Sequence, residues 1–314
     1  MVMLQQMIVL FLMMAIGFLC FKKGILTEEV SKKVSAIVVN VANPCMILES
    51  ALTDQQMKGK ELLQTLLLVA LMYGFLLVLA WILPRILRIK KESSGTYSVM
   101  TVFANIGFMG FPVLAAMYGS GALLYAAVFQ IPFNILIYTY GVAMLTKHRP
   151  AGGTEKDKRN KENRWDTVKK ILNIGVLACM VAILIYFLQI PIPQFLQSLI
   201  ENLGNLTAPL SMMVIGASLA QMPIRDLFLD RKLFLFSMIK LLALPAVWML
   251  LVNRLVDQEI LRGVCLVMMA TPAASMTAML AQQYDADYET ASRGVALTTL
   301  LSVITMPILA AVFL

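Results

Sequence analysis

The chain has 314 residues, of which 60% are hydrophobic and only 14% are charged, and its mean hydropathy is +0.80. Soluble globular domains contain about 45–50% apolar and about 25% charged residues, so this composition excludes a water-soluble globular domain. The net charge of +8 would suggest a nucleic-acid partner for a soluble protein, but in a membrane protein it records Lys and Arg on the cytoplasmic side. We therefore predict a polytopic membrane protein with no nucleic-acid partner.

Apolar segments recur along the whole chain. We predict ten spanning helices, at residues 2–21, 31–51, 62–83, 95–118, 121–146, 171–190, 197–221, 233–253, 263–283 and 290–313. A spanning helix needs about 20 mainly apolar residues. Because lipid offers no hydrogen-bond partners, each span must pair its own backbone groups. The predicted fold class is an all-α polytopic membrane protein with ten transmembrane helices.

Lys and Arg are distributed unequally between the connections. The odd-numbered connections, together with the span ends beside them, hold 21 of the 26 basic residues, and the even-numbered connections hold 4. Because cytoplasmic loops are rich in Lys and Arg, we expect the odd-numbered connections in the cytoplasm and both termini outside the cell membrane. The longest connection, residues 147–170, is then a basic cytoplasmic linker that contacts anionic membrane lipid.

This linker separates two halves, residues 1–146 and 171–314, that resemble each other at an offset of 165 residues. The offset pairs NVANP, which ends at Pro44, with NLTAP, which ends at Pro209. It also sets NIGFMGFP in the fourth span opposite ATPAASMT in the ninth. Because each half has five spans, an odd number, the second half enters the membrane from the opposite side. The halves are therefore predicted to form an inverted repeat, which is typical of secondary transporters.

Helix-breaking and small polar residues interrupt the fourth and ninth spans at matching positions. They are Asn105, Gly107, Gly110 and Pro112 in the fourth span, and Thr271, Pro272, Ala273 and Ser275 in the ninth. Proline costs about 3 kcal/mol in a helix interior, and glycine also weakens a helix. We expect two broken helices that meet near the membrane midplane and bind a small anion at their half-helix N-termini. Either break alone would also be explained as a packing kink.

Several other polar residues are candidates for the substrate path. Asn43 precedes a proline and either lines the cavity or caps freed backbone groups. Gln130 and Asn134 lie four residues apart, so they share a helix face that borders the path. Lys240 is the one charge well inside a predicted span, where it attracts the anion or extends its ammonium to the cytoplasmic end.

The acidic residues bear on gating and on the driving ion. Asp285 and Asp287 fall at a short cytoplasmic connection, where they are solvated or capping groups, or contact a gate or an ion. No Asp or Glu lies near the middle of a predicted span. This favours uniport or exchange driven by the membrane potential, with coupling to sodium or protons as the alternative.

The sequence contains no pattern typical of catalysis or of a metal site. The four cysteines lie in apolar runs without a CxxC pair, and His148 has no partner at metal-ligand spacing. We therefore expect neither an enzyme nor a cofactor. A non-transporting membrane sensor is a further alternative, although no connection is long enough to hold a signalling domain. The oligomeric state stays open, a homodimer included.

The segments VNVANPCMILESAL, NIGFMGFPVLAAMYG and APLSMMVIGASLAQ resemble the auxin efflux carrier family, which includes plant PIN-type carriers and bacterial permeases for small carboxylic acids such as malate and malonate. The resemblance implies a fold like that of bile-acid symporters and NhaA, with helices four and nine crossing at prolines. It further implies a scaffold of helices 1, 2, 6 and 7, and a transport domain of helices 3–5 and 8–10 that moves as an elevator. The substrate of such a protein is a small organic anion, and the family's key asparagine matches Asn105.

Overall fold

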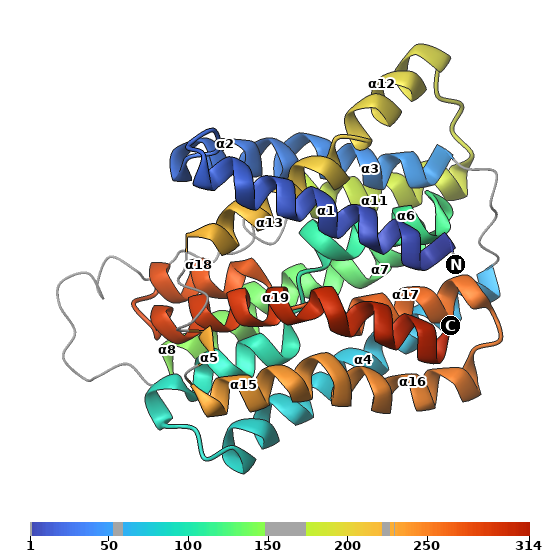
Figure 1. Ribbon diagram of the computed structural model, residues 1–314. Helices are drawn as coiled ribbons and strands as arrows, with labels where there is room; N and C mark the ends of the chain where they lie inside the picture. The colour runs from blue at the N-terminus through green and yellow to red at the C-terminus, as the bar shows by residue number, and fades with distance from the viewer. Residues whose placement is uncertain (1, 53–58, 148–173, 222–226, 229) are drawn as a thin grey trace, which may run out of the picture.

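The computed structural model describes residues 2–52, 59–147, 174–221, 227–228 and 230–314 (Figure 1). Every regular element in these ranges is a helix. The greater part of the predicted linker, residues 147–170, lies outside the described residues.

The helices follow the apolar segments of the sequence. Those of the first half are α1 (Val2–Lys22), α2 (Glu28–Ile37), α3 (Asn43–Glu49), α4 (Gly59–Ile86), α5 (Lys91–Val102), α6 (Phe111–Tyr118), α7 (Gly121–Leu136) and α8 (Val142–Thr146). Those of the second half are α11 (Ile174–Leu188), α12 (Gln194–Gly204), α13 (Thr207–Ala220), α15 (Arg231–Met238), α16 (Leu244–Leu255), α17 (Glu259–Ala270), α18 (Ser275–Gln283) and α19 (Tyr288–Phe313).

Wider π-helical turns extend several of these helices into longer rods. Those at Val38–Ala42, Ile137–Gly141 and Ile239–Ala243 each join two helices, and the one at Ile106–Gly110 begins a rod that continues as α6. In three cases the next helix has a proline in its first two positions: Pro44, Pro112 and Pro245. Proline has no N–H to donate, so a helix must adjust its pairing just before one. At these three prolines, therefore, the hydrogen-bond pairing of the helix shifts by one residue, and the helix continues.

Six segments in the described ranges are long and apolar enough to cross a membrane. Three shorter apolar helices, Ile8–Lys22, Ile106–Tyr118 and Ile174–Leu188, fall within the first, fourth and sixth predicted spans. The chain is thus a multi-pass membrane protein, and the count of ten spans stays a prediction. The fourth and ninth spans fall short because each contains a non-helical segment, and the sixth begins among residues that are not described.

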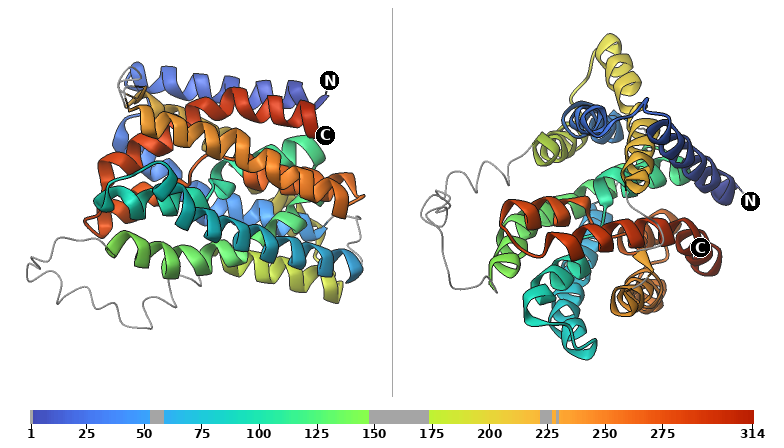
Figure 2. Two further views of the ribbon diagram at one scale, coloured as in Figure 1. Left: turned by 90° about the horizontal axis from the view of Figure 1, so that it is seen from below. Right: turned by 60° about the vertical axis from the view of Figure 1, so that its left-hand side comes forward.

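The helices form two layers with a thin middle zone (Figures 1 and 2). One layer contains α1, α2, α3, α11, α12 and α13, and the other contains α4, α5, α8 and α15 to α19. Helices α6 and α7 run between them. The two termini lie at the same end of the molecule.

The first layer depends on a close contact between α1 and α13. A Cβ atom added to Gly17 would lie 2.2 Å from the carbonyl oxygen of Met213, and one added to Gly216 would lie 1.9 Å from that of Met14. Small residues allow helix backbones in a membrane to approach this closely. Both glycines are therefore required by contact between two backbones.

We predict that Gly216→Ala destabilises the protein, because the new methyl group would overlap the backbone of α1. Such overpacking costs roughly 1–3 kcal/mol, which would appear as a lower melting temperature in detergent. Gly74→Ala is the matched control, since a Cβ at Gly74 would have no heavy atom within 4 Å. Equal melting of the two variants would contradict the close contact of α1 with α13.

Candidate functional site

Two non-helical segments, one in each half, lie side by side in the structure. Helix α5 ends at Val102 and helix α17 ends at Ala270. The N–H of Asn105 donates to the carbonyl of Pro272 (2.7 Å), and the N–H of Ala274 donates to the carbonyl of Phe103 (3.0 Å). These bonds form an antiparallel bridge between Ala104 and Ala273. We call these two segments, together with the first residues of the half-helices that follow them (residues 103–108 and 271–276), the crossing.

Local sequence explains why the chain leaves helical geometry at the crossing. Thr271 precedes a proline, which disfavours the helical conformation, and its ψ is 147°. Asn105 has φ −79° and ψ 60°, and its carbonyl accepts from the N–H groups of both Met109 and Gly110 at 3.1 Å. The Asn105 carbonyl, which the break leaves outside a regular helix, thus finds two hydrogen-bond donors within the protein.

Thr298 on α19 stabilises the crossing through a hydrogen bond to its backbone. The N–H of Ala273 donates to Thr298 Oγ1 (3.1 Å), and the Thr298 hydroxyl donates to the carbonyl of Gly294 (2.7 Å). The sequence analysis did not single out Thr298. The available signal is the polar series Thr298, Ser302 and Thr305, at helical spacing in an apolar span.

Four backbone N–H groups at the crossing have no backbone acceptor among the described residues. They belong to Gly107 and Phe108 at the start of one half-helix, and to Ser275 and Met276 at the start of the other. These four residues are half-buried, whereas the residues immediately before each pair, and those immediately after, are buried. These four N–H groups thus belong to the residues of the crossing that are partly accessible. We call them the donor positions.

Asn43 reaches the crossing from the first layer. Its Nδ2 atom would lie 3.4 Å from a Cβ added to Gly107, and its Oδ1 atom is buried without a hydrogen-bond partner in the described structure. Asn105 is 5% exposed, and its side-chain amide makes no hydrogen bond with the described residues. Gly107, two residues after Asn105 in the chain, therefore lies against Asn43 from the first layer.

The remaining residues predicted for the crossing lie in or beside it. Thr271, Pro272, Gly110 and Pro112 are buried, and Thr271 Oγ1 lies 3.5 Å from the carbonyl of Met268. A Cβ added to Gly110 would lie 3.7 Å from the Thr271 methyl group. The two predicted elements are thus in direct contact.

Gln130 and Asn134 form a small polar group on α7. The Asn134 amide donates to the Gln130 carbonyl (2.9 Å), and Gln130 Oε1 is buried with no partner in the described structure. Both stay candidates for the wall of the substrate path.

Lys240 is 2% exposed and lies in the π-helical turn between α15 and α16. Its ammonium donates to the carbonyl of Thr101 (3.3 Å), in the last turn of α5. A cation is favourable at a helix C-terminus because the unpaired carbonyls there carry partial negative charge. Lys240 thus contacts the carboxyl end of α5 rather than the donor positions.

The two aspartates lie at the turn between α18 and α19. Asp287 caps α19 by accepting a hydrogen bond from the Thr290 N–H (3.0 Å), and Asp285 is exposed with a φ of 48°. A gating or ion-contact role for either aspartate stays a prediction. No group of three or more metal-ligating side chains occurs in the residues that were described.

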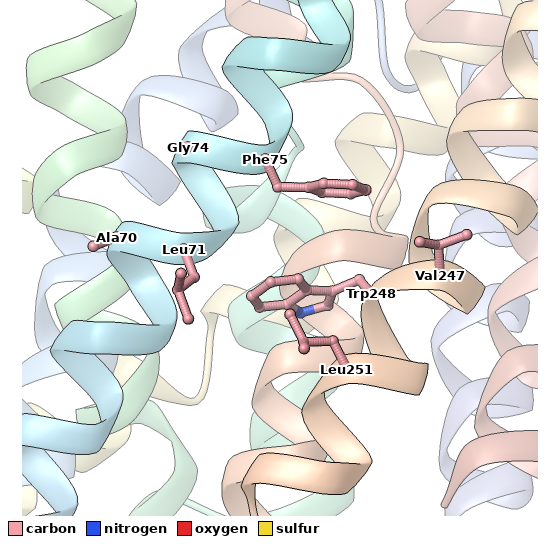
Figure 3. A pocket seen from close by; sticks show the side chains of 7 residues that line it. All are labelled: Ala70, Leu71, Gly74, Phe75, Val247, Trp248 and Leu251. Carbon is pink, nitrogen blue, oxygen red and sulfur yellow. The ribbon is translucent and has the colours of Figure 1, made fainter.

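Two cavities lie away from the crossing. The first, of about 380 Å³, is apolar and lies between α4 and α16, where Trp248 stacks on Phe75 with ring centroids 6.3 Å apart (Figure 3). The second, of about 730 Å³, is lined by α4, the start of α5, and the segment from Tyr140 to Lys147 that contains α8. Neither cavity is lined by a residue of the crossing.

A multi-pass helical protein whose two halves meet through paired non-helical segments has the architecture of a membrane transporter. The comparisons agree, because the model of the membrane transport protein family matches residues 2–310. The chain belongs to this family, which confirms the resemblance to the auxin efflux carriers.

Two archaeal relatives match along nearly their whole length. An uncharacterized transporter of Methanocaldococcus jannaschii is 24% identical over 313 residues, covering 97% of this chain and 96% of the relative. An uncharacterized transporter of Methanothermobacter thermautotrophicus is 23% identical over 294 residues, covering 93% of this chain and 92% of the relative. These names agree with a transporter rather than an enzyme.

We predict that Thr298→Val weakens the crossing, because it leaves the buried N–H of Ala273 without an acceptor. An unsatisfied buried donor costs roughly 1–3 kcal/mol, measurable as a lower melting temperature. Thr299→Val is the control, since the Thr299 hydroxyl donates only to the carbonyl of Val295 in its own helix. If both variants melt like the parent, Thr298 does not support the crossing.

Proposed function

We propose that the protein is a secondary transporter of small organic anions, such as malate, malonate or indole carboxylates, and that it binds the substrate carboxylate at the crossing. The observation that carries this proposal is the set of four donor positions, two from each half of the chain. A carboxylate accepts several hydrogen bonds, and the N-terminal end of a half-helix carries partial positive charge.

The side chains around the donor positions suit the same ligand. Asn43 and Asn105 offer neutral amide donors, and Gly107 lets a ligand approach the backbone closely. Lys240, which lies at the C-terminal end of α5 just before the crossing, attracts the anion through its positive charge. Because the described residues of the crossing contain no carboxylate, nothing there repels an anion.

The proposed mechanism is an elevator with alternating access. This mechanism needs an inverted repeat, and two helix contacts support one: α1 packs on α13, and α11 packs on α3. At the 165-residue offset α1 corresponds to α11, and α3 corresponds to α13. The two contacts are therefore equivalent in the two halves. In this proposal helices 1, 2, 6 and 7 form the scaffold, and helices 3–5 and 8–10 carry the substrate across.

The driving force follows from the charge of the substrate. Export of one negative charge down a membrane potential of 100 mV, outside positive, gains about 2.3 kcal/mol without any coupling ion. The proposal is therefore uniport or exchange. Flux measured with and without a sodium or proton gradient separates it from coupled symport.

The test begins with a thermal-shift screen of malate, malonate, indole-3-acetate and related acids, followed by flux of any stabilising acid into proteoliposomes. We expect Asn105→Ala to reduce binding and flux by about ten- to a hundredfold. This range corresponds to one hydrogen bond to a charged ligand, about 1.5–3 kcal/mol.

Asn202→Ala is the matched control for Asn105→Ala. Asn202 is exposed on α12, and its amide donates only to the carbonyl of Ser198. This variant should transport like the parent. Unchanged flux in a correctly folded Asn105→Ala protein would mean that the carboxylate binds elsewhere.

The proposed orientation puts both termini outside the cell and the 147–170 linker in the cytoplasm. In a background without native cysteines, we predict that Lys156→Cys reacts with a membrane-impermeant reagent only after the cytoplasmic face is exposed. Asp257→Cys, in the exposed connection between α16 and α17, should react from outside. The reverse labelling pattern would invert the proposed orientation.

A further inference from the structure

The larger cavity described above has no part in the proposed substrate site. It holds about 730 Å³ and is lined by the C-terminal end of α4, the N-terminal end of α5 and the C-terminal end of α8. These helix ends lie toward the lower left of Figure 1. These elements connect the third, fourth and fifth predicted spans. The cavity therefore lies at one end of the membrane-spanning region.

Positive charge surrounds this cavity. Arg85, Arg88, Lys91 and Lys147 line it, and no Asp or Glu does. None of these four cations forms an ion pair with a carboxylate in the described part of the chain. A fifth cation, Lys232, donates to the carbonyl of Arg88 (2.6 Å). Unpaired like charges repel one another, so an anion in the cavity would be stabilised.

The interior of the cavity is mostly apolar. Leu77, Pro84 and Met144 contribute hydrocarbon, and Ser94 and Tyr140 contribute hydroxyl groups. Trp81 lines the cavity and is 63% exposed on α4, and the guanidinium of Arg85 lies 4.0 Å from the centroid of its ring. Tryptophan beside arginine is typical of the boundary between hydrocarbon and headgroups.

Direct contacts hold the walls of the cavity together. The Ser98 hydroxyl donates to the carbonyl of Ala80 (2.7 Å) and so joins α5 to α4. A Cβ added to Gly95 would lie 2.1 Å from the carbonyl oxygen of Met144, so α5 and α8 touch through their backbones. The cavity is therefore preformed and needs no ligand to assemble it.

We propose that this cavity binds the phosphate headgroup of an anionic phospholipid from the cytoplasmic leaflet. The four cations contact the phosphate, Ser94 and Tyr140 add hydrogen bonds, and the acyl chains follow the outer face of α4. That face presents Val78, Trp81 and Ile86, all exposed. A bound lipid would attach the second layer of helices to the bilayer surface.

A soluble anion is the other ligand with this chemistry, and two observations favour the lipid. No residue of the crossing lines the cavity. The lipid also uses the apolar interior and the exposed apolar face of α4, whereas a free phosphate or carboxylate would leave both unused. The proposal is independent of which substrate the crossing binds.

The test uses the full-length protein in an uncharged detergent, and native mass spectrometry to measure binding of phosphatidylglycerol and phosphatidylcholine. We expect the parent to prefer phosphatidylglycerol. The variant Arg88→Gln/Lys91→Gln should lose about tenfold in affinity for phosphatidylglycerol, since each basic residue near an anionic headgroup contributes a several-fold factor. Its affinity for phosphatidylcholine should stay unchanged, which also reports that the variant is folded.

The matched control is Lys22→Gln/Lys23→Gln, which removes the same charge from the end of α1 on the same predicted side of the membrane. This control should keep the parent's preference. Equal losses in the two variants, or no loss in the first, would overturn the proposal. Displacement of the lipid by millimolar glycerol phosphate, which has the headgroup without the chains, would also overturn it in favour of a soluble anion.

Discussion

The structure depends on one constraint: backbone polar groups cannot remain unpaired in hydrocarbon. At the crossing two spans leave helical geometry, and the exposed main chain of one pairs with that of the other through the bonds from Asn105 to Pro272 and from Ala274 to Phe103. Thr298 supplies a third partner from α19. The donor positions are the backbone N–H groups that this pairing leaves without a backbone acceptor. The proposed substrate site and the stability of the two non-helical segments therefore have the same physical origin.

The charges of the protein divide into groups with different roles. Most Lys and Arg residues lie in or beside the odd-numbered connections, which we predict to be cytoplasmic. Four basic residues line the cavity between α4, α5 and α8. Lys240 is buried and is held at the carboxyl end of α5. Basic residues thus orient the chain in our prediction and attract anionic lipid in our proposal, and Lys240 contacts a helix end inside the second layer.

Sequence reasoning located the residues of the crossing but not the way they are joined. Pro112, Pro272 and the nearby glycines carry clear local signals, because they weaken any helix that contains them. Ala104 and Ala273 carry none, since they pair through the backbone. Thr298 was missed because a threonine in a membrane helix usually bonds within its own turn. The Lys240 contact and the basic cavity depend on how α5 packs against α15 and α8, which composition and periodicity do not report.

The bridge between Ala104 and Ala273 has a consequence for how this family diverges. Because Ala104 and Ala273 pair through main-chain atoms, this pairing requires only that their side chains be small. Relatives with 23–24% identity to this chain can therefore keep the same backbone pairing while most of the surrounding residues differ. If Asn43 and Asn105 contact the substrate, as we propose, selection for a new substrate acts on their side chains without changing this backbone pairing.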